Sequence, residues 1–134
     1  MNILLDTHIV LWALTDDERL SETARKIILD IDNNIYYSVV STWEVLLKHS
    51  KKDSNLELSP DKFVEYCNEA GFIPLNLYDK HVLKIQSLIR PENAPDHNDP
   101  FDRLLLAQAK SENMTFMTHD SLIPFYNEKC ILPV

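Results

Sequence analysis

The chain has 134 residues, a length that suits one compact domain and is short for two. Apolar residues make up 45% and charged residues 25%, a globular composition that excludes an intrinsically disordered chain. The formal net charge of −8 argues against broad, non-specific nucleic-acid binding.

Glycine, cysteine and hydropathy exclude several further classes of protein. The single glycine, Gly71, excludes phosphate-binding loops and dinucleotide fingerprints, which need several glycines at fixed spacing. The two cysteines, Cys67 and Cys130, are too few for a disulfide framework, so we expect reduced thiols in a cytoplasmic protein. The longest apolar run, residues 9–14, is too short to span a membrane, and no basic segment precedes Asp6 as a signal peptide would require.

The first third of the chain alternates strand and helix patterns. Residues 3–5 predict a buried strand, and the apolar stretch 9–14 follows it. A helix is expected after Ser21, and the β-branched and aromatic run 35–40 predicts a second strand. Such alternation is typical of βαβ units and a mostly parallel sheet.

The middle of the chain continues this alternation. Residues 41–49 predict a helix, and Ser59-Pro60 predicts the start of another, which Gly71 ends. Residues 72–77 predict a third strand, placed at a sheet edge because Pro74 has no backbone N–H.

The last third completes the expected fold. We expect a helix over residues 79–88 and an irregular loop over 90–98. A helix that begins at Asp99-Pro100 should cover 100–109, and two short strands should follow over 115–118 and 130–132. The sequence therefore predicts an α/β fold, a three-layer α/β/α sandwich with a mostly parallel central sheet, built as a single domain over residues 1–134.

Five acidic residues occupy special positions in this scheme. Asp6 ends the first strand, Glu44 lies in the first turn of the predicted helix 41–49, and Asp120 follows the strand 115–118. Asp99 and Asp102 lie in the first turn of the helix that begins at Pro100. Because strand ends and the starts of following helices share one edge of a parallel sheet, we expect these acids to converge.

Four of the five acids also have a purely structural interpretation. Glu44 would close a capping box with the serine three residues before it. Asp99 would cap its helix, with Asp102 near the positive helix end, and Asp120 would cap the short segment after it. Asp6 is the hardest to explain in this way, because it ends an apolar strand inside the domain.

The acids taken together point to a metal ion. Several carboxylates at one edge repel one another unless a cation lies between them or protons are taken up. Oxygen ligands without His or Cys spacing favour Mg²⁺ or Mn²⁺ over zinc. Such an ion activates water and stabilises phosphoryl oxygens, which is the chemistry of phosphodiester hydrolysis.

Four sequence blocks in a fixed order resemble a known family. They are LLDTH (4–8), STWE (41–44), HNDPFDR (97–103) and THD (118–120), with LLLAQA (104–109) directly after the third. The set resembles the PIN domain family, and within it the VapC-like ribonuclease toxins of bacterial and archaeal toxin–antitoxin systems. The resemblance runs from the first strand to Asp120, nearly the whole chain.

The resemblance implies an enzyme and a set of site residues. It implies a PIN-like fold and a Mg²⁺-dependent endoribonuclease, with Mn²⁺ as an alternative ion, that leaves a 5′-phosphate and a 3′-hydroxyl. The four acids of the family pattern fall on Asp6, Glu44, Asp102 and Asp120, with Asp6 and Asp102 fixing the ion. Asp99 is either part of the metal site or only the helix cap.

Supporting residues lie beside the acids. The hydroxyls of Thr7 and Thr118 either hold a carboxylate or a water or make ordinary strand-end hydrogen bonds, the latter favoured for Thr7. Arg103 either contacts phosphate or pairs with a neighbouring acid. The basic run 48–52 either contacts RNA or complements the helix dipole, the latter favoured. Histidines near the acids are expected to be ordinary surface or loop residues (His8, His97, His119).

The resemblance also implies partners: an RNA substrate, a cognate antitoxin protein and a second copy in a homodimer, without a membrane. The net charge of −8 favours a basic partner segment. The alternatives are a PIN-like interaction module without catalysis, a receiver-type phosphoacceptor domain, and a haloacid-dehalogenase-type phosphatase. The last is disfavoured because His8 stands where its second nucleophile-motif aspartate would be.

Overall fold

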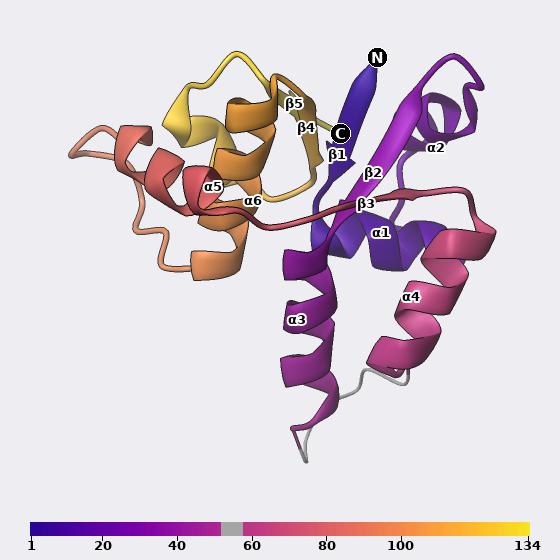
Figure 1. Ribbon diagram of the computed structural model, residues 1–134. Coiled ribbons are helices and arrows are strands. Elements are labelled where there is room, and N and C mark those ends of the chain that lie inside the picture. The colour runs from indigo at the N-terminus through magenta and orange to yellow at the C-terminus, as the bar shows by residue number, and fades with distance from the viewer. Residues whose placement is uncertain (52–57) are drawn as a thin grey trace.

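Parallel strands form the central sheet of the computed structural model, which describes residues 1–51 and 58–134 (Figure 1). They are β1 (Asn2–Leu5), β2 (Asn34–Ser38), β3 (Ile73–Leu75), β4 (Thr115–Thr118) and β5 (Ile131–Pro133). The order is β3-β2-β1-β4-β5, and every neighbouring pair is parallel. The predicted α/β class with a parallel sheet is confirmed, and β3 lies at an edge as Pro74 predicts. This order differs from the 2-1-3-4-5 order of receiver domains, which argues against the receiver alternative.

Helices connect and cover the strands (Figure 1). They are α1 (Thr7–Leu14), α2 (Glu22–Leu29), α3 (Val39–His49), α4 (Pro60–Glu69), α5 (Asp79–Lys84) and α6 (Pro100–Glu112), with 3₁₀ turns η1 (Ile85–Ser87) and η2 (Ile123–Tyr126). The predicted helix 79–88 is therefore α5 followed by a 3₁₀ turn. Lys52, the last residue of the basic run, lies outside the described residues.

The two faces of the sheet bury different sets of side chains. In β1, Ile3 and Leu5 pack into a cluster with residues of α1, α2 and α4, whereas Leu4 packs with residues of α6 and η2 on the other face. Side chains alternate between the faces of a strand, so a run of apolar residues is buried on both sides. This burial produces the predicted three-layer arrangement.

The largest departure from the predicted elements lies between β2 and α3. The sequence predicts a strand through residue 40 and a helix from residue 41, whereas β2 ends at Ser38 and α3 begins at Val39. The Ser38 hydroxyl caps the helix by accepting a hydrogen bond from the Val40 amide at 3.0 Å. Val40 is buried in the cluster beside α6, so tertiary packing overrides the strand propensity of the two valines.

Two further expectations concern membrane-spanning helices and the cysteines. Within residues 1–51 and 58–134, no helix combines the length and the apolar character needed to cross a membrane. Cys67 and Cys130 are both free thiols, as their number and spacing predict.

Candidate metal centre

The predicted acids gather at the carboxyl edge of β1 and β4. Asp6 directly follows β1 and Asp120 lies two residues after β4, and these two strands are neighbours. Glu44 reaches this region from α3, and Asp102 from the first turn of α6. Glu44, Asp102 and Asp120 line one surface pocket, and burial together with the negative charges of Asp6 and Glu44 raises the pKa of Asp102.

Asp6 is buried and held by the end of β4. Its side chain is not used as a helix cap, although Asp6 occupies the N-cap position of α1. Oδ2 instead accepts a hydrogen bond of 2.7 Å from the Thr118 hydroxyl, while Oδ1 has no partner among the described residues. Burial raises the pKa of Asp6 to about 6, and the bond from Thr118 opposes that rise. Thr118 therefore holds a carboxylate, the first of its two predicted roles.

Thr118→Val should raise the pKa of Asp6 further above 6, because it removes the hydrogen bond that favours the ionised form. The free energy of unfolding should fall by about 1–2 kcal/mol, since the buried carboxylate and the Asp120 amide both lose a partner. A ¹³C NMR titration of the Asp6 carboxyl and urea unfolding measure the two effects. Thr118→Ser keeps the hydroxyl and is the matched control; an unchanged Asp6 pKa in the valine variant would contradict the assignment.

Glu44 does not form the predicted capping box. Because α3 begins at Val39, Glu44 lies in the second turn, and Ser41 uses its hydroxyl in a buried hydrogen bond of 2.8 Å with Thr7. The Glu44 Oε2 atom pairs with Lys48 Nζ at 2.7 Å, and Oε1 is buried without a partner among the described residues. The Thr7 hydroxyl therefore contacts a serine rather than a carboxylate.

Asp99 and Asp102 share the first turn of α6 but differ in environment. Asp99 is the N-cap, and its Oδ1 accepts hydrogen bonds from the amides of Phe101 (2.9 Å) and Asp102 (3.2 Å). The Asp102 side chain is buried instead. Burial, with the charges of Asp6 and Asp99, raises the pKa of Asp102 to about 10. Burial and the neighbouring charges therefore favour the protonated form of Asp102 when no cation is bound.

Asp120 is oriented by its own turn. Its Oδ1 accepts a hydrogen bond of 2.8 Å from the Leu122 amide, and its own amide donates to the Thr118 hydroxyl at 3.0 Å. Asp120 does not cap the helix as predicted, because η2 begins at Ile123 and its N-cap, Leu122, has no side-chain capping bond. Asp120 lines a surface pocket together with Glu44, Lys48 and Asp102. The site is thus accessible from solvent although most of its acids are buried.

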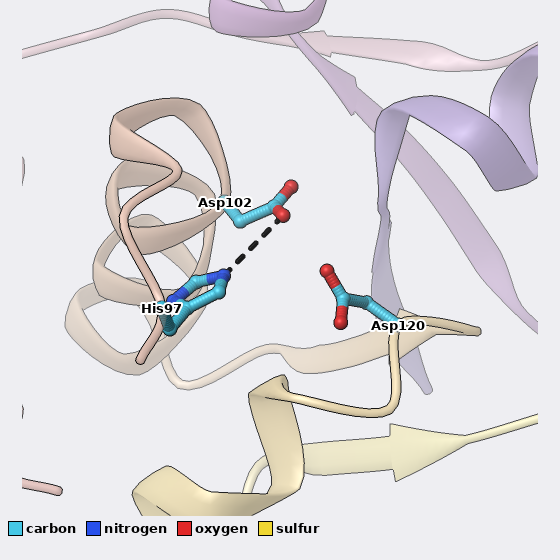
Figure 2. Close-up of side chains that lie close together, drawn as sticks. All are labelled: His97, Asp102 and Asp120. Carbon is cyan, nitrogen blue, oxygen red and sulfur yellow. Dashed lines mark ion pairs between the residues drawn. The ribbon is translucent and has the colours of Figure 1, made fainter. Parts of the chain in front are cut away.

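His97 lies in a loop, as predicted, but its side chain is not at the surface. The side chain is only 2% exposed, and its ring Nε2 lies 3.5 Å from Asp102 Oδ2. Ligand atoms of His97, Asp102 and Asp120 all lie within 4.8 Å of one another, and Figure 2 shows the three side chains converging. The sequence signal for this residue was its position two residues before Asp99, at the start of the block 97–103.

The other candidates lie at the margin of the site. Arg103 is half-buried in α6 and does not line the pocket. His8 and His119 are exposed, as predicted, and the His119 ring bonds the Val134 carbonyl.

The arrangement fits a divalent cation. Three buried polar atoms, Asp6 Oδ1, Glu44 Oε1 and His97 Nε2, have no hydrogen-bond partner among the described residues. Buried polar atoms normally have a partner, because leaving one unpaired is costly. Unpaired oxygens on carboxylates that repel one another are the donor set that Mg²⁺ and Mn²⁺ prefer.

Comparisons with known proteins agree with this fold. A model of the PIN domain family matches residues 3–126. No curated protein sequence matches the chain. Among solved structures, VapBC2 from Rickettsia felis bound to a DNA fragment from their promoter has a TM-score of 0.64 and 14% identity, and the match covers 100% of this chain and 98% of that one. FitAcB from Neisseria gonorrhoeae has a TM-score of 0.61 and 16% identity, with coverage of 97% and 96%.

Proposed function

The chain belongs to the PIN domain family, and from this premise we propose that it is a metal-dependent endoribonuclease, the toxin of a type II toxin–antitoxin pair. The observation that carries the proposal is the group of acids Asp6, Glu44, Asp102 and Asp120 at the carboxyl edge of β1 and β4. Unpaired buried oxygens on Asp6 and Glu44 support it further, because they are suited to a cation.

The four acids would bind the metal ion together in the proposed reaction. Asp6 and Asp102 would hold the ion, Mg²⁺ or alternatively Mn²⁺, with Glu44 and Asp120 contributing directly or through water. When bound, the ion would lower the pKa of a water and stabilise the phosphoryl oxygens of RNA. Thr118 fixes the orientation of the Asp6 carboxylate, and the Leu122 amide fixes that of Asp120. Asp99 acts here as the cap that starts α6 beside Asp102.

Basic side chains beside the acids would contact the RNA backbone. Lys48 lines the pocket, and its Nζ lies 2.7 Å from Glu44 Oε2. Arg103 directly follows Asp102 in α6 but does not line the pocket, so its guanidinium would bind a phosphate only at the margin of the site. Lys48 is therefore the basic side chain that would contact a phosphodiester over the acidic centre.

An antitoxin partner would bind beside the site. Four apolar side chains of α3 are 40–52% exposed: Val39, Trp43, Leu46 and Leu47. Trp43 packs edge-on against Phe101, which lines the pocket, with ring centroids 4.9 Å apart. We propose that a partner covers this apolar face and directs a basic group into the acidic pocket, and that the toxin itself forms a homodimer.

RNA cleavage tests the proposed function. Purified protein, freed of any partner, is incubated with total bacterial RNA in Mg²⁺, in Mn²⁺ and in excess EDTA. Discrete fragments should form with either ion and disappear in EDTA, and end-mapping should find 5′-phosphates. Fragments that persist in EDTA would contradict the metal dependence. RNA left intact in every lane would favour the interaction module without catalysis.

A further inference from the structure

His97 brings an imidazole nitrogen to a centre whose other candidate ligands are carboxylate oxygens. We infer that His97, Asp102 and Asp120 form a mixed nitrogen–oxygen site in which His97 Nε2 is a metal ligand, so that the centre binds a divalent transition ion such as Mn²⁺ in preference to Mg²⁺. The inference rests on the proposed function for the acidic centre, and adds to it the identity of one ligand and the class of ion.

The position of the ring carries the inference. His97 Nε2 belongs to a side chain that is 2% exposed, and it points toward Asp102 and Asp120 (Figure 2). Nε2 lies 3.5 Å from Asp102 Oδ2, within the distance of an ion pair, but it has no hydrogen-bond partner among the described residues.

The other ring nitrogen is already engaged. His97 Nδ1 and the Tyr126 hydroxyl are 2.7 Å apart, and Tyr126 is 5% exposed. In the tautomer in which Nδ1 donates this hydrogen bond, the lone pair of Nε2 is directed at the two aspartates. Histidine ligands of metal ions typically donate their second N–H to such an outer partner, which fixes the ring.

The loop that carries His97 is anchored to the segment that carries Tyr126. Arg90 donates hydrogen bonds to the carbonyls of Leu122 and Pro95, and its guanidinium lies 5.0 Å from the centroid of the Tyr126 ring. These contacts tie residues 90–97 to the turn 122–126. The imidazole is therefore held in place before any ion binds.

The ligand types predict which ion is preferred. Mg²⁺ binds oxygen ligands almost exclusively and keeps several waters. An imidazole nitrogen beside two carboxylates raises affinity for first-row transition ions, of which Mn²⁺ is the weakest binder and the one closest to Mg²⁺ in its ligand preference. Loss of His97 should therefore weaken Mn²⁺ binding far more than Mg²⁺ binding.

Electron spin echo envelope modulation of the Mn²⁺-loaded protein tests the ligand directly, because a coordinated imidazole gives a ¹⁴N signal. The wild type should show this signal and His97→Leu should lose it. By calorimetry, His97→Leu should weaken Mn²⁺ binding by about tenfold or more, and Mg²⁺ binding by less than about threefold. His8→Gln and His119→Gln are the matched controls, because His8 lies two residues after Asp6 and His119 directly before Asp120, and both are exposed; both variants should keep the signal.

The outcomes separate this inference from the proposed function. A wild-type spectrum without ¹⁴N modulation, or a folded His97→Leu that retains it, overturns the inference. If His97→Leu does not fold, the decision rests on the wild type and the two controls: a signal lost in either control assigns the nitrogen elsewhere. RNA cleavage in Mg²⁺ with no ¹⁴N signal would contradict His97 as a ligand and support the proposed nuclease activity. A ¹⁴N signal without cleavage would support His97 as a ligand and contradict the nuclease activity.

Discussion

Asp102→Asn should lower the rate of RNA cleavage by more than about a hundredfold. Removing a residue that only hydrogen-bonds a metal ligand already lowers metal affinity or activity by about 10–100-fold, and Asp102 would be a ligand itself. The same substitution should stabilise the metal-free protein. Burial and neighbouring charges raise the pKa of Asp102 to about 10, so its ionised form is disfavoured in the folded state. The asparagine amide has the shape of the carboxyl and carries no charge. The free energy of unfolding at pH 8 should therefore rise by at least about 1 kcal/mol.

Opposite changes in activity and stability distinguish a functional acid from a structural one. Cleavage of total RNA in Mg²⁺ measures the first change, and urea unfolding in EDTA the second. Asp32→Asn is the matched control, because Asp32 is exposed in the turn before β2, at the opposite edge of the sheet from the site, and it should alter neither quantity. Loss of stability in Asp102→Asn with cleavage unchanged would show that Asp102 supports the fold alone.

The stability of the metal-free protein should fall as the pH rises from 5 to 9. Asp6 and Asp102 have folded-state pKa values of about 6 and about 10, both above the ordinary value of 3.8. The folded state therefore binds more protons than the unfolded state between 3.8 and these values, and the free energy of unfolding decreases with pH across that window. The slope is at most about 1.4 kcal/mol per pH unit for each group, and above pH 6 it comes mainly from Asp102.

A bound ion should oppose this fall in stability with rising pH. A metal ligand must be deprotonated, so Mg²⁺ or Mn²⁺ should raise the melting temperature more at pH 8 than at pH 5, and binding should release protons. Thermal unfolding at several pH values, in EDTA and with each ion, measures the effect. Calorimetry in buffers of different ionisation enthalpy counts the protons. Asp102→Asn should flatten the EDTA profile above pH 6; a wild-type profile that is already flat there would contradict the raised pKa of Asp102.

The sequence by itself predicts the convergence of the acids. Apolar runs alternating with helical patterns specify a parallel sheet, and in such a sheet strand ends gather at one edge. Asp6 and Asp120 follow strands whose limits in the structure nearly match the predicted ones. The helix start at Asp99-Pro100 is equally readable, because a cap is a contact within a single turn.

Some helix boundaries needed the tertiary structure. A capping box at Ser41 and Glu44 fits the local sequence, yet α3 begins at Val39. The valines there favour a strand when considered alone. Burial of Val40 beside α6 makes the helix the better solution, and α6 lies about sixty residues further along the chain. Local patterns report contacts within a turn or along a strand, and they carry no information about such packing.

Only the tertiary structure decided which side chains complete the site. Thr118 donates to Asp6 across 112 positions of the chain, and His97 meets Tyr126 across 29. The loop of His97 has no periodicity, and its conformation depends on the contacts of Arg90 with the segment after β4. The sequence determines which acids reach the edge of the sheet, because backbone topology places them there. Their protonation, and the imidazole beside them, depend on desolvation and on contacts between distant segments, which exist only once the chain has folded.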